Sequence, residues 1–348
     1  MPLMKTSVAV AMAGISGLLV TAVLGFPFIP WLRKLRFGQT ILDIGPGWHK
    51  SKQGTPTMGG LMFIIGTVAA ILVTAVTDKI AGGDIIAEGS LIASEQYTKL
   101  WSGVLMALAF ALIGFVDDYI KAVKHRNLGL TIKEKTVAQM LVIVAYLTSL
   151  YMDMHGQPYM FVPFVGIIEI GFFYWIFGIV VIYAAINAVN FTDGVDGLCS
   201  SIAATTAVSL AVIAALKGLY GFSMASSALA GACVGFLLWN KNPAKVFMGD
   251  TGSLFLGGML VAIAYSLNCP LILLLSGLVF VIEGASDVLQ IVYYRVSGGK
   301  RIFKMAPIHH HFEMCGWSEK KIVRVFTLVN IIGGAAAVAL MYYGGYIL

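Results

Sequence analysis

Five aspartates in apolar surroundings carry much of the chemistry that this sequence offers. They are Asp117, Asp118, Asp193, Asp196 and Asp250, and none has a basic residue immediately beside it. Carboxylates that converge on one surface repel each other unless a cation lies among them. Mg²⁺ is the hard cation that proteins bind through a few carboxylates together with substrate phosphates. The pattern therefore favours Mg²⁺ as a cofactor.

The adjacent pair Asp117 and Asp118 closes an apolar stretch. On a helix, Asp117 and Lys121 share one face at the i,i+4 spacing, whereas Asp118 points about 100° away. An ion pair at the membrane surface would explain Asp117 and Lys121 alone. The second carboxylate favours a functional role.

The segment from Asn187 to Leu198 places amides and carboxylates between two apolar stretches. Asn187 and Asn190 lie one helical turn apart, and Asp193 and Asp196 are each followed by glycine. A turn with an N-cap would explain Asp196, but a cap needs only one polar residue. The others predict a site that handles a charged group beside the bilayer.

A third polar segment runs from Asn240 to Ser253. Asp250 alone fits the N-cap of the apolar helix that follows. The same segment contains Asn240, whose amide can hydrogen-bond a nucleobase edge, and Phe247, whose ring can stack on a base. The combination favours contact with a nucleotide.

Three consecutive histidines, His309, His310 and His311, precede the last apolar stretch. In a helix their side chains would fan out by about 100° each, which is poor geometry for one metal ion. We expect them to contact substrate or phosphate rather than zinc. A basic loop at the membrane surface is the alternative.

Membrane helices must position these clusters. The 348-residue chain is 59% hydrophobic and 11% charged, so most of it cannot be the surface of a soluble protein. Because a helix of about 20 apolar residues spans a bilayer, we expect an all-α polytopic membrane protein with ten transmembrane helices in a single domain, residues 1–348. The expected spans lie near 7–31, 57–77, 100–116, 136–151, 170–189, 198–216, 224–239, 251–268, 271–294 and 322–346.

The distribution of Lys and Arg predicts the orientation. If the loop after the first span is cytoplasmic, all 23 of these residues except Lys5, Lys79, Lys99 and Lys217 lie on the inner side. The positive-inside rule then places both termini on the outer side and the aspartates on the cytoplasmic side. Because the basic residues are divided among four loops, we expect no nucleic-acid partner.

On this topology, every even-numbered span begins at the cytoplasmic side with free N–H groups. The glycine-rich segment 54–60 precedes the second span, a capping box of Thr131 and Glu134 precedes the fourth, and Asp196 and Asp250 would begin the sixth and eighth. Such a surface suits phosphate groups. The segment 54–60 lacks the Gly-Lys-Ser/Thr ending of a P-loop.

Two further features lie apart from these clusters. Glu283 and Asp287, at i,i+4 in the ninth apolar stretch, predict structural hydrogen bonding with a kink near Gly284 and Ser286. The outer connection 152–169 mixes aromatic and β-branched residues with Pro and Gly, which predicts a short hairpin. The four cysteines have no paired spacing, so we expect neither a disulfide framework nor a zinc site.

Taken together, the motifs resemble those of a known family, the phospho-N-acetylmuramoyl-pentapeptide transferases, within the polyprenyl-phosphate hexosamine-1-phosphate transferase superfamily. The paired aspartates and the Asp250 loop resemble the whole superfamily. Residues 55–60 and the triple His resemble the muramoyl-pentapeptide branch. The resemblance is carried, in the family's order, by segments 54–60, 117–121, 187–198, 247–254 and 307–313.

The resemblance implies transfer of phospho-MurNAc-pentapeptide from UDP-MurNAc-pentapeptide to undecaprenyl phosphate, giving lipid I and UMP. It implies Mg²⁺ as cofactor, a homodimer in the lipid bilayer, and an active site at the cytoplasmic face of the bacterial plasma membrane. A sister enzyme that moves GlcNAc-1-phosphate from UDP-GlcNAc is one alternative. An ion-coupled transporter with its proton site at Glu283 and Asp287 is another, but transporter sites tend to lie near the midplane.

Individual roles also follow from the resemblance. Asp250 would be the Mg²⁺ ligand, Asp117 the base or nucleophile, and Asp118 its partner, so these three are the candidate catalytic residues. The other candidates would bind substrate: Lys52, Asp196, Asn240 and Phe247 at the uridine, Lys121 and Lys133 at phosphates, Asn190, Asp193, His309, His310 and His311 near the sugar and peptide, and Asn187 in the same segment.

Overall fold

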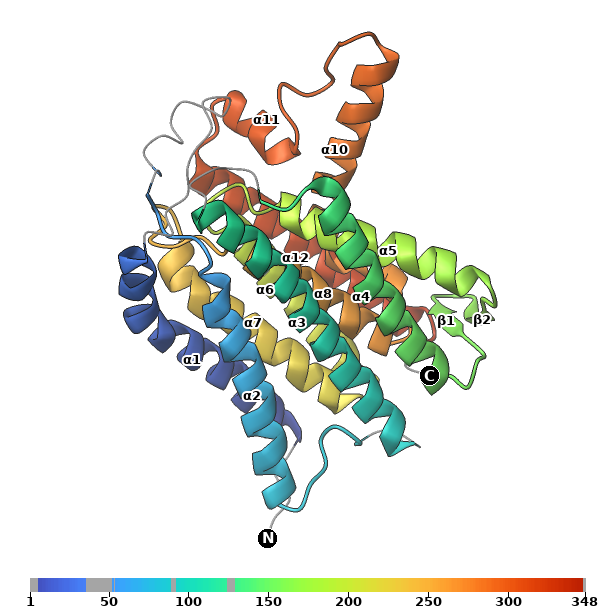
Figure 1. Cartoon of the computed structure of the whole chain (residues 1–348). Coiled ribbons are helices and arrows are strands. Elements are labelled where there is room, and N and C mark those ends of the chain that lie inside the picture. Colours follow the sequence, from blue (N-terminus) through green and yellow to red (C-terminus); the bar gives the residue numbers. More distant parts are fainter. Residues whose placement is uncertain (1–5, 36–51, 53, 89–91, 124–128, 347–348) are drawn as a thin grey trace.

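The computed structural model describes residues 6–35, 52, 54–88, 92–123 and 129–346 (Figure 1). Within these residues the regular secondary structure is helical apart from one two-stranded sheet. The long helices are α1 (Thr6–Lys34), α2 (Gly60–Ile80), α3 (Ala93–Val123), α4 (Ile132–Asp153), α5 (Phe173–Phe191), α6 (Leu198–Leu216), α7 (Tyr220–Asn240), α8 (Gly249–Ser266), α10 (Leu278–Val296) and α12 (Glu319–Tyr343). The short elements are β1 (Tyr159–Val162), β2 (Gly166–Glu169), η2 (Pro270–Ile272), α9 (Leu273–Ser276) and α11 (Ile308–Met314).

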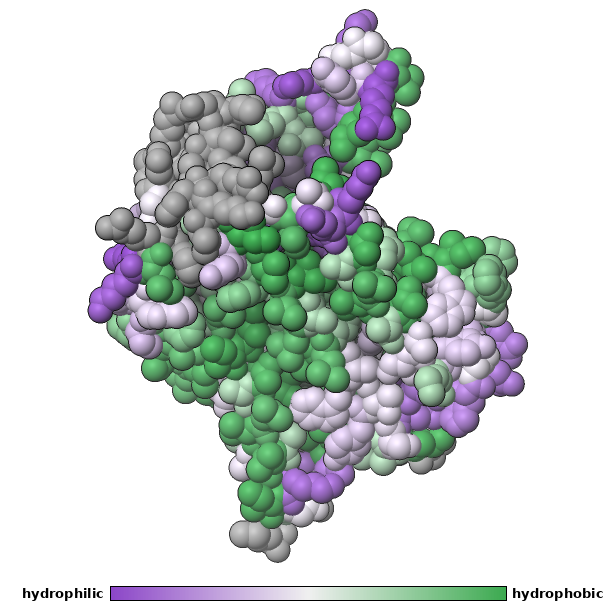
Figure 2. Space-filling model, in the orientation of Figure 1, coloured by the Kyte–Doolittle hydropathy of each residue, from purple (hydrophilic) through white to green (hydrophobic). Residues whose placement is uncertain are grey.

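The length and apolar composition of these helices indicate a multi-pass membrane protein. Among the described residues, eight helices, α1 to α7 and α12, are long and apolar enough to cross a bilayer, and the bent pair around α9 and α10 would be a ninth. The expected span 251–268 corresponds to α8, which is not among them, so the count of ten stays a prediction. Figure 2 shows a broad apolar band across the molecule, with hydrophilic residues gathered beyond it.

The ninth apolar stretch is broken at a position ahead of the residues where the sequence predicted a kink. The chain bends by 91° between Pro270–Ser276 and Leu278–Val296, and α10 continues through Gly284 and Ser286 without a break. The helix is thus not interrupted at those two residues, and the expected kink there stays a prediction. Gly284 serves close packing, because a Cβ there would lie 3.0 Å from the Cβ of Ala188 in α5.

Helix α8 lies at the centre of the packing that positions the polar clusters. Almost all of its residues are buried, and it packs against α2, α3 and α5. Two glycines permit the close approach: a Cβ on Gly258 would lie 2.8 Å from Ala107 Cα of α3, and one on Gly257 would lie 2.9 Å from Ile186 Cα of α5. Small residues let helix backbones approach closely in membranes, so α8 is held tightly between α3 and α5.

The predicted hairpin is confirmed. Strands β1 and β2 pair antiparallel, with Tyr159 opposite Glu169 and Val162 opposite Gly166. The ring of Phe161 packs edge-on against that of Tyr346, and the Phe164 amide donates to the Gly344 carbonyl at 2.9 Å. The hairpin therefore anchors the chain after α12.

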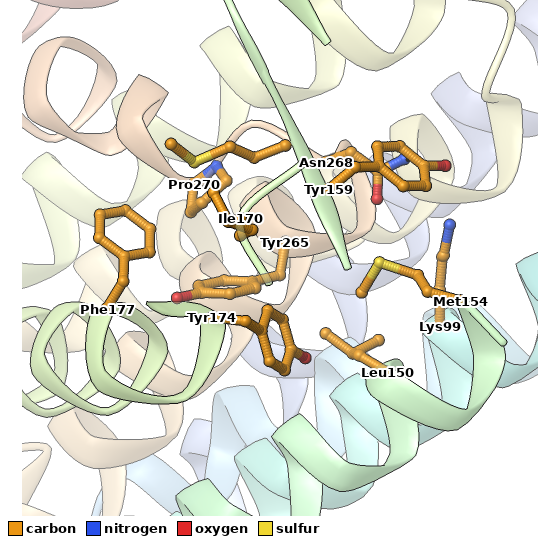
Figure 3. A pocket seen from close by; sticks show the side chains of 11 residues that line it. Lys99, Leu150, Met154, Tyr159, Ile170, Tyr174, Phe177, Tyr265, Asn268 and Pro270 are labelled. Atoms are coloured by element: carbon orange, nitrogen blue, oxygen red, sulfur yellow. The ribbon is translucent and has the colours of Figure 1, made fainter. Parts of the chain in front are cut away.

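A small cavity of about 20 Å³ lies beside this hairpin. Figure 3 shows Lys99, Tyr159 and Tyr265 among its lining side chains. Tyr265 stands near the end of α8, whereas Asp250 stands at its start. A helix rises 1.5 Å per residue, so roughly 22 Å separates the two. The cavity is thus distinct from the aspartate cluster.

The orientation in the membrane can be tested with the exposed Cys315, because the other three cysteines are buried. Since Cys315 follows α11 on the expected inner side, a membrane-impermeant maleimide should label it only after cells are opened. In a Cys315→Ser background, a cysteine introduced by Glu88→Cys, at an exposed position between α2 and α3, should be labelled in intact cells. The opposite pattern would contradict a cytoplasmic active site.

Candidate active site

Three aspartates from two helices meet at one point. Asp117 and Asp118 lie near the end of α3, and Asp250 lies in the first turn of α8. One carboxylate oxygen from each lies within 4.8 Å of the others. Gly114 permits this meeting, because a Cβ there would lie 2.2 Å from the Asp250 carbonyl oxygen. The convergence expected from the sequence is therefore present for these three residues.

Asp118 caps α8 from a different helix. Its buried carboxylate accepts hydrogen bonds from the backbone N–H groups of Asp250 and Thr251, at 3.2 and 2.9 Å, and from the Thr251 hydroxyl at 2.7 Å. The N-cap residue of α8 is Met248, and Asp250 lies inside the helix. The alternative that Asp250 is merely the N-cap is therefore wrong, because Asp118 satisfies the exposed N–H groups.

Asp250 is surrounded by cations and an amide. Its carboxylate lies 3.1 Å from Lys121 Nζ and 2.9 Å from Lys135 Nζ, and it accepts a 2.9 Å hydrogen bond from Asn190 Nδ2. Three carboxylates and two lysines leave this cluster with one formal negative charge. Such a centre favours the approach of a further cation.

We did not single out Lys135 from the sequence, where Lys133 was the expected phosphate ligand. The predicted capping box is confirmed: the Thr131 side chain accepts from the Glu134 amide, and Glu134 accepts from that of Thr131. It fixes where α4 begins, and residues two apart on a helix point in widely different directions. Lys135 consequently reaches Asp250, whereas Lys133 is exposed.

Asp117 and Lys121 form the predicted i,i+4 ion pair. The Asp117 carboxylate also accepts a 2.8 Å hydrogen bond from the Leu130 amide, so it is fixed from a second chain segment. Lys121 thereby bridges Asp117 and Asp250. The pair belongs to the aspartate cluster and is more than a marker of the membrane surface.

The segment 187–197 contributes along its length. Asn190 also donates to Ser253 Oγ at 2.7 Å, while Asn187 donates to Gln139 Oε1 at 3.2 Å. Asp193 lies in the turn after α5. Burial, and then the charge of Asp250, raise the pKa of Asp193 well above its usual range. Of the residues predicted here, Asn190 is the one that touches Asp250.

Asp196 belongs to a second charged group, which we call the Lys52 clamp: Lys52, Asp196, Asn242 and Glu319. Lys52 Nζ lies 2.7 Å from Asp196 Oδ1 and 2.8 Å from Glu319 Oε1. Burial alone would lower the pKa of Lys52, but its hydrogen bonds to both carboxylates outweigh burial and raise the pKa.

Two expectations change at this clamp. The N-cap of α6 is Gly197, at φ 79° and with no side-chain cap, so the N-cap role proposed for Asp196 is wrong. Its carboxylate accepts instead from Asn242 Nδ2 at 3.2 Å and Ala244 N at 3.0 Å. Glu319 was not singled out from the sequence, because a glutamate that begins a helix is an ordinary first-turn residue.

Asn240 and Phe247 lie in the segments that lead to α8. Asn240 is 2% exposed. Its oxygen accepts from Gly197 N at 3.1 Å and its nitrogen donates to the Val246 carbonyl at 3.0 Å. The amide therefore braces the start of α6, and its contact with a nucleobase stays a prediction. Phe247 is half-buried.

The glycine-rich segment 54–60 supports this loop. Phe247 N donates to the Pro56 carbonyl, and the N–H groups of Gly59 and Gly60 donate to the carbonyls of Phe247 and Met248. These two N–H groups at the start of α2 are thus used within the protein. A Cβ on Gly60 would lie 2.3 Å from Gly252 Cα, which explains the glycine.

The three histidines each face a different partner. His309 is fully buried, with Nδ1 3.0 Å from Glu283 Oε2, and its ring lies against Gly194. His310 pairs with Glu313 at 2.7 Å, and His311 Nδ1 accepts from Lys304 N at 3.1 Å. The hydrogen bonding expected of Glu283 is confirmed. Contact of the histidines with substrate stays a prediction.

Comparisons with known proteins place this site in context. Residues 100–268 match the sequence profile of glycosyl transferase family 4, and residues 52–64 match signature 1 of the phospho-N-acetylmuramoyl-pentapeptide-transferases. A protein of that name from Listeria monocytogenes serotype 4b (strain CLIP80459) is 40% identical over 326 residues, which cover 93% of this chain and 96% of the relative. One from Bacillus thuringiensis (strain Al Hakam) is 42% identical over 328 residues, covering 91% and 95%.

Both relatives align with nearly the whole chain, and their identity far exceeds what a shared fold alone would give. The profile match includes the three aspartates of the cluster, and the signature begins at Lys52 of the clamp. The chain therefore belongs to the phospho-N-acetylmuramoyl-pentapeptide-transferase family.

Proposed function

We propose that this protein transfers phospho-MurNAc-pentapeptide from UDP-MurNAc-pentapeptide to undecaprenyl phosphate, forming lipid I and UMP. The observation that carries the proposal is the meeting of Asp117, Asp118 and Asp250 at helix ends, beside Lys121 and Lys135. A diphosphate needs cations close to the reacting phosphorus, and a lipid phosphate needs a site within reach of the membrane. The cluster meets both needs.

In this reaction an oxygen of the lipid phosphate attacks the phosphorus that bears the sugar. One P–O bond forms, the P–O bond to the uridine-bearing phosphate breaks, and UMP leaves with the bonding electrons. Lys121 and Lys135, which reach Asp250 from α3 and α4, would stabilise the negative charge that develops on these oxygens. A lipid phosphate that carries a proton transfers it to Asp117.

Mg²⁺ is the cofactor that the residues fit. The three carboxylates provide hard oxygen ligands within 4.8 Å of one another, and the lysines leave a formal negative charge at the centre. We assign Asp250 as the principal ligand, because the Asp118 oxygens are held by backbone N–H groups of α8, whereas the partners of Asp250 are side chains. When bound, Mg²⁺ would polarise the diphosphate and neutralise its charge.

The remaining predicted residues complete the donor site. Lys52, Asp196, Asn240 and Phe247 are assigned to the uridine, Asn187, Asn190, Asp193 and the three histidines to the sugar and peptide, and Lys133 with Lys121 to phosphates. We place this site at the cytoplasmic face of the bacterial plasma membrane. We also expect ten spans and a homodimer.

Parallel transfer assays test the proposed function. Purified protein should transfer radiolabelled phospho-sugar to undecaprenyl phosphate from UDP-MurNAc-pentapeptide, and far less from UDP-GlcNAc. Preference for UDP-GlcNAc would identify a sister transferase instead. Absence of transfer from either donor, with proton-coupled uptake in proteoliposomes, would favour a transporter.

A further inference from the structure

The Lys52 clamp joins four chain segments through one glutamate. Glu319 is the first residue of α12. One of its carboxylate oxygens lies 2.8 Å from Lys52 Nζ. Its other oxygen accepts from Asn242 Nδ2 at 3.1 Å and from the Asp196 amide at 3.3 Å. The segment before α2, the turn before α6 and the loop before α8 thus all donate to a single carboxylate.

The clamp is shielded from water, which strengthens its contacts. The side chains of Lys52, Asp196 and Glu319 are 15%, 3% and 12% exposed. At such burial an ion pair is screened less than on an open surface, and each charged hydrogen bond contributes more than a neutral one. Removal of Glu319 would leave Lys52, Asn242 and the Asp196 amide each without one acceptor.

The clamp also leaves a donor for a ligand. A lysine ammonium has three hydrogens, and among the residues that the structure describes the contacts with Asp196 and Glu319 use two of them. The third suits an acceptor oxygen, such as a carbonyl or phosphate oxygen of a nucleotide. A free lysine side chain would lose rotamer freedom on being fixed, and Glu319 imposes that order before the ligand arrives.

We propose that Glu319 is a positioning residue for the sugar donor: it fixes the Lys52 ammonium and the 193–197 turn in the arrangement that binds the nucleotide part of the donor. The inference rests on the proposed function. It deepens that function by assigning a role to α12, which lies outside both matched segments, 52–64 and 100–268. Lys52 is itself the first residue of the matched signature.

The test is the variant Glu319→Gln, which keeps the size of the side chain and removes its charge. Loss of one charged hydrogen bond typically costs about tenfold in affinity or more. We expect the KM for UDP-MurNAc-pentapeptide to rise about tenfold while kcat stays within about twofold and the KM for undecaprenyl phosphate is unchanged. UMP should bind about tenfold more weakly in equilibrium titration. Glu319→Asp should give an intermediate donor KM.

Two further variants make the test specific. If Glu319 acts through Lys52, the double variant Lys52→Met with Glu319→Gln should raise the donor KM hardly more than Lys52→Met alone. Glu169→Gln changes an exposed glutamate of the hairpin and should leave every parameter at the value of the unmodified protein.

Several results would overturn the proposal. These are an unchanged donor KM in Glu319→Gln, a fall in kcat without a change in KM, an equal rise in both KM values, or additive effects with Lys52→Met. Should Glu319→Gln fail to fold, Glu319→Asp keeps the charge, and the same comparisons decide with that variant. If the unmodified protein transfers from neither donor but UMP binding still depends on Glu319, the proposed function fails, and Glu319 remains a positioning residue only for a nucleotide ligand.

Discussion

Asp250→Asn is expected to lower kcat by about a hundredfold or more while the protein remains folded. Asparagine keeps the size of the side chain and an oxygen that can accept from Asn190, and Asp118 rather than Asp250 caps α8. The change removes the charge that Lys121 and Lys135 share and the best ligand for Mg²⁺. Initial rates across a Mg²⁺ titration, with size-exclusion profiles in detergent, measure the effect.

The matched control is Asp84→Asn, an aspartate of the connection after α2 that pairs with Lys79 and Tyr97. It should retain full turnover. Near-normal turnover of Asp250→Asn at every Mg²⁺ concentration would remove Asp250 from the chemistry.

Asp117→Asn is expected to reduce turnover by a comparable factor, because it removes the carboxylate that Lys121 and the Leu130 amide hold in place. An ionised carboxylate there could act as a base toward the lipid phosphate or attack the donor phosphorus itself. We favour the base, because the lysines and the metal site already serve the donor and leave activation of the acceptor as the missing task.

Isotope exchange separates the two routes. A covalent intermediate on Asp117 requires labelled UMP to exchange into the donor without any lipid acceptor, whereas direct attack by the lipid phosphate permits no such exchange. We expect none in a preparation freed of lipid phosphate. Exchange that disappears in Asp117→Asn would make Asp117 the nucleophile.

The sequence predicted the elements that follow from local rules. The i,i+4 pair of Asp117 and Lys121, the capping box of Thr131 and Glu134, and the hairpin within 152–169 are all confirmed. Each depends on residues close in the chain, whose relative geometry is set by a single helix or turn.

The errors arose where distant segments decide the structure. Asp118 takes over the capping role assigned to Asp250 because α3 ends beside the start of α8. Asp196 binds Lys52 and the 242–244 loop instead of capping α6. Similarly, Lys135 and Glu319 acquire their partners only through contacts between distant segments that the sequence pattern does not specify.

The central claim is that the sugar is transferred together with its phosphate. Following the donor's second phosphate tests this claim most directly. UDP-MurNAc-pentapeptide labelled with ³²P at the phosphate that bears the sugar is incubated with the protein, Mg²⁺ and undecaprenyl phosphate, and the products are separated into lipid and aqueous fractions. Transfer of phospho-sugar predicts that the label enters the lipid fraction while one UMP is released for each labelled lipid. Label that remains in water-soluble UDP would show that the sugar moved without its phosphate, which would contradict the reaction assigned to the aspartate cluster.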